Sequence, residues 1–101
     1  MNPDAYGMLG ILNRAGFIRF GEGMEKGFCK GYLLLLAKDA SPRILKTFEE
    51  AAKANHLPIY YANTKQELGA PLGRDALTAV LVTSQKGASS LLKKLQKGET
   101  S

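Results

Sequence analysis

The chain has 101 residues and a hydrophobic fraction of 45%, enough for one compact domain, residues 1–101, whose core needs no metal or disulfide. The net charge of +5 favours a polyanion, such as nucleic acid or an acidic membrane surface, as a partner. A single cysteine, Cys29, excludes an internal disulfide and indicates a reducing compartment. Asp4 stands where a signal peptide would be basic, and the longest apolar run, 32–37, is far shorter than the roughly 18 residues of a membrane span. These features predict a soluble, cytoplasmic protein.

Helical and extended patterns alternate along the first part of the chain. Apolar residues at spacings of three and four predict an amphipathic helix over 4–15, which Gly16 ends. The segment 17–20 alternates apolar and basic residues and favours a short strand. Residues 21–31 show weak helical periodicity, and their four glycines make them a poor helix. Residues 32–37 form the strongest strand candidate, because a strand covered on both faces is continuously apolar.

The second part of the chain continues the alternation. A helix is expected after Ser41 as its N-cap, with Pro42 at its first position and an end before Pro58. The remaining predicted elements are a strand over 59–62, a helix from Thr64 to about Leu68 that Gly69 stops, a strand over 76–83 and a closing helix over 84–97. The alternation predicts an α/β layered sandwich.

The side chains that most often carry catalysis are sparse in this sequence. His56, the only histidine, is expected to be a solvated residue at a helix end, and Cys29 a small buried hydrophobe. Asp39 should lie at the C-terminal edge of the central strand, where it either carries function or braces a loop or helix. One histidine and one cysteine supply too few soft ligands for a metal site. The sequence therefore predicts neither an enzyme nor a cofactor.

The predicted central strand also predicts which of its side chains are buried. If 32–37 lies inside the sheet, Leu34 and Leu35 should both be almost inaccessible, because they point to opposite faces that are each covered.

Two segments combine glycines with basic side chains, as the close approach of a phosphate backbone requires. The first supplies Arg19, Lys26 and Lys30 with Gly21, Gly23, Gly27 and Gly31, and the second supplies Lys65, Gly69, Gly73 and Arg74. Neither matches a P-loop or a dinucleotide fingerprint, and turn glycines with solvated charges are the alternative interpretation of each. In a layered fold the two segments can lie at one edge. Gly69 and Gly73 are expected where the backbone turns sharply and an RNA approaches closely, and Gly69 as a C-terminal helix cap would have a positive φ.

An RNA could use such an edge in two ways. The tip "GAPLG" would offer Leu68, Pro71 and Leu72 to an unstacked base, and Glu22 or Glu25 would accept hydrogen bonds from a guanine edge.

Five segments in order, "MLGILNRAG", "GE", "LLLLAKDAS", "ELGAPLGRDA" and "AVLVTSQKGASSLLKKL", resemble the bacterial YlxQ branch of the ribosomal L-seven-Ae and L-thirty-e superfamily. The resemblance covers about Met8 to Lys97. It implies a three-layer α-β-α sandwich with a four-stranded mixed sheet, and RNA binding, in the best-known members to kink-turns. The residues that it implies for RNA contact are Gly21, Glu22, Gly23, Glu25 and Lys26 at the start of helix two, and Glu67, Leu68, Gly69, Ala70, Leu72, Gly73 and Arg74 in the second segment.

The chain departs from the kink-turn pattern in the first of these regions. Kink-turn binders carry "G-x-N-E-x-x-K", whereas this chain reads "GEGMEKG", and the loop after the second region is reduced to "RDAL". We therefore expect a monomeric RNA-binding protein for ribosomal or messenger RNA, or for the ribosome, without strict kink-turn specificity. The alternative is a protein-interaction module that kept the fold and lost the RNA site. The two differ in whether Arg19, Lys26, Lys30 and Arg74 cluster on one face.

Overall fold

The structure, a computed structural model, describes residues 3–21 and 24–99; of these, 24–26 and 97–99 are described by their backbone alone. Helices and strands alternate as the sequence predicts. The elements are α1 (Pro3–Arg14), β1 (Ile18–Arg19), the 3₁₀ helix η1 (Met24–Lys30), β2 (Leu33–Ala37), α2 (Pro42–Ala54), β3 (Ile59–Ala62), α3 (Lys65–Gly69), the 3₁₀ helix η2 (Ala70–Leu72), β4 (Ala79–Val82) and α4 (Gln85–Glu99).

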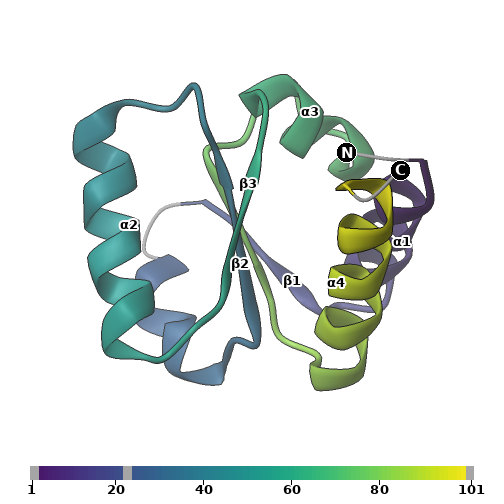
Figure 1. The fold of residues 1–101 in the computed structure, drawn as a ribbon, viewed down its shortest axis with the longest axis horizontal. Coiled ribbons are helices and arrows are strands. Elements are labelled where there is room, and N and C mark those ends of the chain that lie inside the picture. The colour runs from purple at the N-terminus through teal and green to yellow at the C-terminus, as the bar shows by residue number, and fades with distance from the viewer. Residues whose placement is uncertain (1–2, 22–23, 100–101) are drawn as a thin grey trace.

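The four strands form one mixed sheet in the order β1-β4-β2-β3. β2 and β3 run parallel, while β4 runs antiparallel to β1 and β2. Helix α2 and η1 cover one face of the sheet, and α1, α3 and α4 cover the other (Figure 1). This arrangement confirms the predicted three-layer α-β-α sandwich with a four-stranded mixed sheet.

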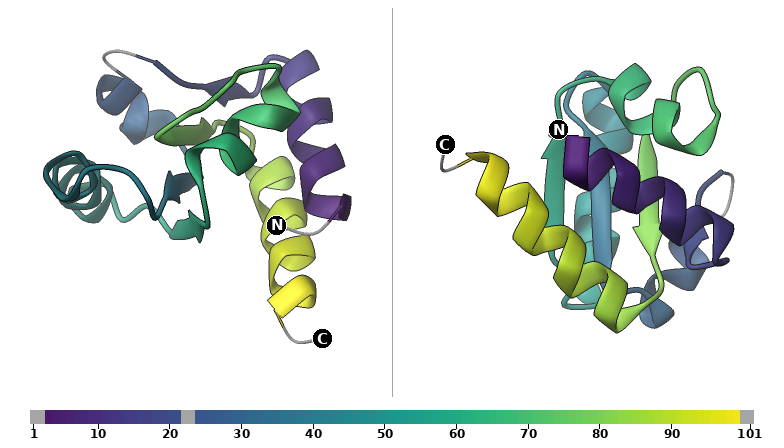
Figure 2. Two further views of the ribbon diagram at one scale, coloured as in Figure 1. Left: turned by 90° about the horizontal axis from the view of Figure 1, so that it is seen from above. Right: turned by 90° about the vertical axis from the view of Figure 1, so that its right-hand side faces the viewer.

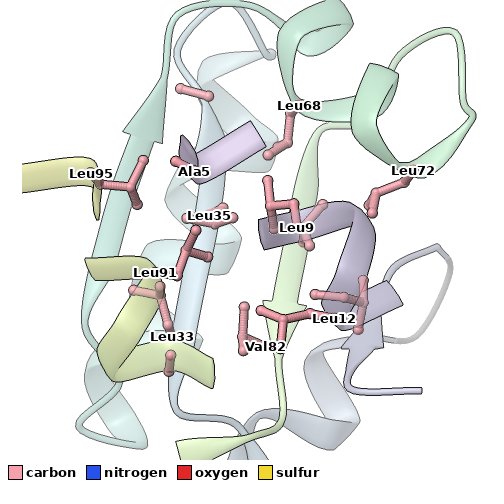
Figure 3. Packing of buried hydrophobic residues seen from close by; sticks show 14 of the residues in the cluster. Ala5, Leu9, Leu12, Leu33, Leu35, Leu68, Leu72, Val82, Leu91 and Leu95 are labelled. Atoms are coloured by element: carbon pink, nitrogen blue, oxygen red, sulfur yellow. The ribbon is translucent and has the colours of Figure 1, made fainter. Parts of the chain in front are cut away.

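The central strand β2 supplies both halves of the core. Leu33 and Leu35 pack with α1 and α4 (Figure 3). Leu34 packs with η1 and α2 on the opposite face. The predicted burial of Leu34 and Leu35 is confirmed, since both are 0% exposed. Tyr32, expected to open the strand, lies outside it and is exposed.

Two predicted strands are shorter than the sequence suggests. The segment 17–20 contributes only β1, and 76–83 contributes only β4. Leu77 explains part of this difference, because its N–H donates to the Lys65 carbonyl oxygen at 3.0 Å and so bonds to the start of α3. Segment 21–31, predicted as a weak helix, yields the 3₁₀ helix η1.

The expectation that Cys29 is buried is wrong. Cys29 is an exposed free thiol, and its neighbour Phe28 occupies the inward position of η1 at 1% exposed. Phe28 packs on Phe48 of α2 with ring centroids 6.0 Å apart. A 3₁₀ helix turns every three residues, so only one residue in three of η1 faces the sheet, and the larger apolar side chain takes that place.

The N-terminus of α2 is as predicted in position but not in its capping bond. Ser41 stands at the N-cap and Pro42 follows it, yet the Ser41 side chain makes no capping hydrogen bond. Helix α4 has the side-chain cap instead, because Ser84 Oγ accepts from the Gly87 N–H at 3.1 Å.

The C-terminus of α2 ends in a Schellman motif. The Leu57 N–H donates to the Ala52 carbonyl oxygen at 2.9 Å, and the His56 N–H donates to that of Lys53 at 3.2 Å. His56 is exposed, as predicted, and holds the left-handed position of the motif with φ 53°. A side chain with a Cβ is strained in this conformation, which glycine adopts readily.

We therefore expect His56→Gly to stabilise the fold by about 1 kcal/mol and to raise the Tm by roughly 4–8 °C. The matched control is Ala54→Gly, two residues earlier and inside the helix, which should cost about 1 kcal/mol. Thermal unfolding followed by circular dichroism measures both variants. A loss of stability in both would show that His56 is not strained.

A second prediction concerns Tyr61 of β3, whose hydroxyl donates a hydrogen bond to a Glu49 carboxylate oxygen on α2. This bond, followed by burial and by the negative charge of Glu49, raises the pKa of Tyr61 above its ordinary value of 10.0. Since the folded-state pKa lies above the unfolded value, the stabilisation is complete below about pH 10 and is lost as the pH rises through the folded-state pKa.

The substitution Glu49→Gln should lower the pKa of Tyr61, because it removes the negative charge beside the hydroxyl and replaces the carboxylate with a weaker hydrogen-bond acceptor. NMR of labelled tyrosine ring carbons across an alkaline titration measures this pKa directly. Glu50→Gln, an exposed neighbour on the same helix, serves as the control and should leave it unchanged. Equal Tyr61 pKa values in the wild-type protein and Glu49→Gln would contradict the assignment.

Candidate nucleic-acid interface

The second glycine segment begins at a well-fixed helix start. Thr64 is the N-cap of α3, and its Oγ1 accepts from the Glu67 N–H at 3.0 Å. The Lys65 N–H donates to Asp39 Oδ1 at 2.9 Å, which joins the loop after β2 to the start of α3. Of the two roles left open for Asp39, this bond supports the bracing of a loop.

Of the two glycines expected at a sharp turn, Gly73 lies at one and Gly69 does not. Gly69 has φ −80°, so the expectation of a positive φ there is wrong, and α3 continues into η2. The chain reverses at Gly73, with φ 73°, where the Gly73 N–H donates to the Ala70 carbonyl oxygen and the Arg74 N–H to that of Gly69, at 3.1 and 3.0 Å. These two bonds form a Schellman motif whose left-handed position favours glycine.

Gly69 is needed for a different physical reason. A Cβ at this position would lie 2.9 Å from the Arg74 carbonyl oxygen and 3.1 Å from Ala76 Cα. The returning chain 74–76 therefore packs directly on the backbone of α3, and any side chain at Gly69 would push it away.

The two leucines of the predicted apolar tip are buried, and its proline, Pro71, is half-buried. Leu68 is completely buried and Leu72 is 7% exposed, and both belong to the core with Leu9 of α1 (Figure 3). The spacing of four residues explains this, because it places Leu68 and Leu72 on one side of the continuous α3–η2 unit. That side contacts α1, so neither leucine is available to pack on a base.

Arg74 connects the two glycine segments. Its guanidinium lies over the Phe20 ring, 4.9 Å from the ring centroid. Phe20 directly precedes Gly21, which is exposed and has φ 101°, so the start of the first segment and the turn of the second lie side by side. Sequence reasoning missed Phe20, since no spacing pattern pairs residues so far apart in the chain.

The predicted group of Arg19, Lys26, Lys30 and Arg74 does not form one cluster. Arg74 lies before β4 begins, whereas Lys30 lies before β2 begins, and these antiparallel strands start at opposite ends of the sheet. Arg19 is exposed on the edge strand β1. Glu22 and Gly23 lie outside the described residues, as do the side chains of Glu25 and Lys26.

The end of the sheet that carries Arg74, which we call the turn end, comprises segments 36–43 and 62–78. It is close to neutral in charge. Its four basic residues are Lys38, Arg43, Lys65 and Arg74, and its three acidic residues are Asp39, Glu67 and Asp75, for a sum of +1. Within residues 3–21 and 24–99, no three side chains of His, Cys, Asp or Glu gather as a metal site would require.

Comparison with protein families gives the identity of the fold. A model of the ribosomal protein L7Ae/L30e/S12e/Gadd45 family matches residues 22–93, which is most of the chain. The chain belongs to this family. A solved structure described as a protein with unknown function from Bacillus halodurans superposes with a TM-score of 0.84 at 20% identity, covering 91% of this chain and 96% of that one, and so shares the fold. No curated protein sequence matches the chain.

Membership of the L7Ae/L30e/S12e/Gadd45 family indicates an RNA-binding protein of the ribosomal type. The matched range contains the whole α3–η2 unit and the Arg74 turn. None of the helices in the described part of the chain has the length and apolar character of a membrane-spanning helix.

The burial of Leu72 leads to a testable consequence. We expect Leu72→Asp to destabilise the protein by at least about 3 kcal/mol, because it removes core packing and places a carboxylate among apolar side chains. Ala70→Asp, exposed in the same 3₁₀ helix, should change the stability by about 0.5 kcal/mol or less. Urea denaturation followed by circular dichroism measures both. Comparable stabilities for the two variants would restore the exposed-tip interpretation.

Proposed function

We propose that this protein is a non-catalytic, cytoplasmic RNA-binding protein of the YlxQ-like branch, a single-domain monomer associated with the ribosome or with transcripts. It recognises structured RNA that is bulged or kink-turn-like. The contact surface, which we call the turn surface, consists of Gly21, Ala70, Gly73 and Arg74, all exposed. Family membership supports RNA binding, and the pairing of Arg74 with Phe20 supports this location.

Arg74 is the observation that carries the proposal. The guanidinium carbon lies 4.9 Å from the Phe20 ring centroid, a cation–π contact that restrains the side chain. A guanidinium presents a fork of N–H donors that suits a phosphate or a guanine. A guanidinium held in this way loses little conformational freedom on binding. The adjacent Gly73 and Ala70 carry no bulk that would keep an RNA backbone at a distance.

The burial of Leu68 and Leu72 favours recognition by shape over base packing. With the apolar side chains in the core, the turn surface offers charge and a small-residue backbone, which suit the sugar-phosphate chain of a bent RNA. The N–H groups of Gly73 and Arg74 are bonded within the turn, so the side chain of Arg74 is the principal donor. This supports binding to kinked or bulged RNA without strict kink-turn specificity.

A protein-interaction module is the second candidate. The near-neutral charge of the turn end favours it, since a surface that binds RNA only through phosphates normally carries an excess of cations. The two functions differ in their dependence on salt. Binding through phosphate neutralisation weakens steeply as salt rises, whereas contact between neutral surfaces does not.

The test compares Arg74→Gln with Arg74→Lys on a hairpin RNA that carries a bulge. Arg74→Gln should weaken binding and reduce the slope of log K against log salt by about 0.7–0.9, the value of one phosphate contact. Arg74→Lys keeps the charge and the slope but loses the stacked geometry, so the affinity should fall by about 0.5–1 kcal/mol, roughly two- to fivefold.

Lys46→Gln on the outer side of α2 removes one charge far from the turn surface and is the control. Fluorescence anisotropy at several salt concentrations gives the affinities. Binding that does not depend on salt, or that Arg74→Gln leaves unchanged, would favour the protein-interaction module.

A further inference from the structure

Most of the excess positive charge is at the end of the sheet opposite the turn surface. There β2 and β3 begin and β4 ends, beside the start of α4 and the end of η1 (Figure 2). The segments at this end are 13–19, 27–33, 53–58 and 83–87. We call this the basic end. It carries five basic residues, Arg14, Arg19, Lys30, Lys53 and Lys86, all exposed, and these segments contain no acidic residue. The charge is therefore +5 here against +1 at the turn end.

Helix electrostatics account for only part of this excess. Arg14 and Lys53 lie in the last turns of α1 and α2, where a cation is favoured by the helix dipole. Lys86 lies in the first turn of α4, where a cation is disfavoured. Lys30 ends the 3₁₀ helix η1, where a cation is likewise favoured. Arg19 lies on the strand β1, so helix dipoles explain neither Arg19 nor Lys86.

Two exposed aromatic side chains lie among these cations. Phe17 is 42% exposed and Tyr32 is 46% exposed. They lie on either side of the end of β4: the Thr83 N–H donates to the Phe17 carbonyl oxygen, and the Tyr32 N–H donates to that of Val82, each at 2.8 Å. Neighbouring strands are about 4.8 Å apart, so these two backbone positions are about 10 Å apart. A few unstacked nucleotides span that separation.

We propose that the basic end is a second RNA-binding surface, which takes a single-stranded segment. Phe17 and Tyr32 offer ring faces on which bases stack, and Arg19, Lys30 and Lys86 neutralise the phosphates. Aromatic faces combined with cations are the common design of surfaces that bind single strands without sequence preference. This goes beyond the proposed function, because it concerns another end of the molecule and an unpaired strand rather than a bent one. A structured RNA at the turn surface could supply that strand from its flank.

Oligouridine of about 12 nucleotides, which has no stable secondary structure, is the probe. Phe17→Leu/Tyr32→Leu keeps apolar side chains but removes both ring faces, and should weaken binding by about tenfold or more. Lys30→Gln/Lys86→Gln should reduce the slope of log K against log salt by about 1.4, the value of two contacts to a single strand. The matched control, Lys38→Gln/Arg43→Gln, removes two charges at the turn end and should leave the slope unchanged.

Arg74→Gln separates this proposal from the preceding one. Oligouridine binding that survives Arg74→Gln and fails in the basic-end variants supports a second surface, whatever happens to bulged RNA. Amide NMR shifts on adding oligouridine should concentrate near Phe17, Tyr32 and Thr83. The lysine pair, on exposed sites, tests the proposal even if the aromatic pair loses stability, which thermal unfolding reports.

Three results would overturn the proposal. The first is an equal decrease in the slope of log K against log salt for Lys30→Gln/Lys86→Gln and for Lys38→Gln/Arg43→Gln. That result would mean that the RNA is attracted by the overall charge and not by a defined surface. The second is oligouridine binding that depends on Arg74 and not on Phe17 and Tyr32. The third is no binding of oligouridine at low salt, in which case an acidic protein surface becomes the occupant that fits the charge.

Discussion

The burial of β2 on both faces is the constraint on which the rest of the structure depends. Leu33 and Leu35 attach α1 and α4, while Leu34 and Leu36 attach η1 and α2. Since alternate residues of one strand point to opposite faces, a run of leucines holds two helical layers together without any metal or disulfide. The strand also defines the two ends of the sheet. Because β2 and β4 are antiparallel, the loops after β2 and before β4 lie at one end, and the loops before β2 and after β4 lie at the other.

The turn surface is held in place by that core rather than by its own contacts. Leu68 and Leu72 fix the α3–η2 unit on α1, and the bond between Asp39 and the Lys65 N–H fixes its start to the loop after β2. Gly69 lets the returning chain pack closely, and Arg74 then reaches Phe20. The exposed residues of the turn surface are thereby held in one arrangement, as the proposed recognition of a bent RNA by its shape would need.

Charge and glycine are separated in this molecule. The turn at Gly73 lies at the end of the sheet where the positive and negative charges nearly balance. The excess of basic residues lies at the opposite end, together with the exposed rings of Phe17 and Tyr32. In the two proposals, a folded RNA is bound at the turn surface and an unpaired strand at the basic end. Both contacts should weaken as salt rises, and the second more steeply, because more cations contact phosphates there.

The sequence by itself determined the layers of the fold, since the continuous apolar run of β2, the amphipathic stripe of α2 and the alternation of elements are local patterns set by the periods of strands and helices. It also identified the two glycine segments and the family. Tertiary structure alone decided which apolar residues were core: Leu72 and Cys29 were each assigned the wrong environment, because η2 and η1 are 3₁₀ helices whose facing depends on what they pack against. The tertiary structure also decided that Arg74 contacts Phe20 and that Lys30 lies at the opposite end of the sheet from Arg74. These placements depend on the direction of β4 relative to β1 and β2, which the pairing of strands sets and no single segment encodes.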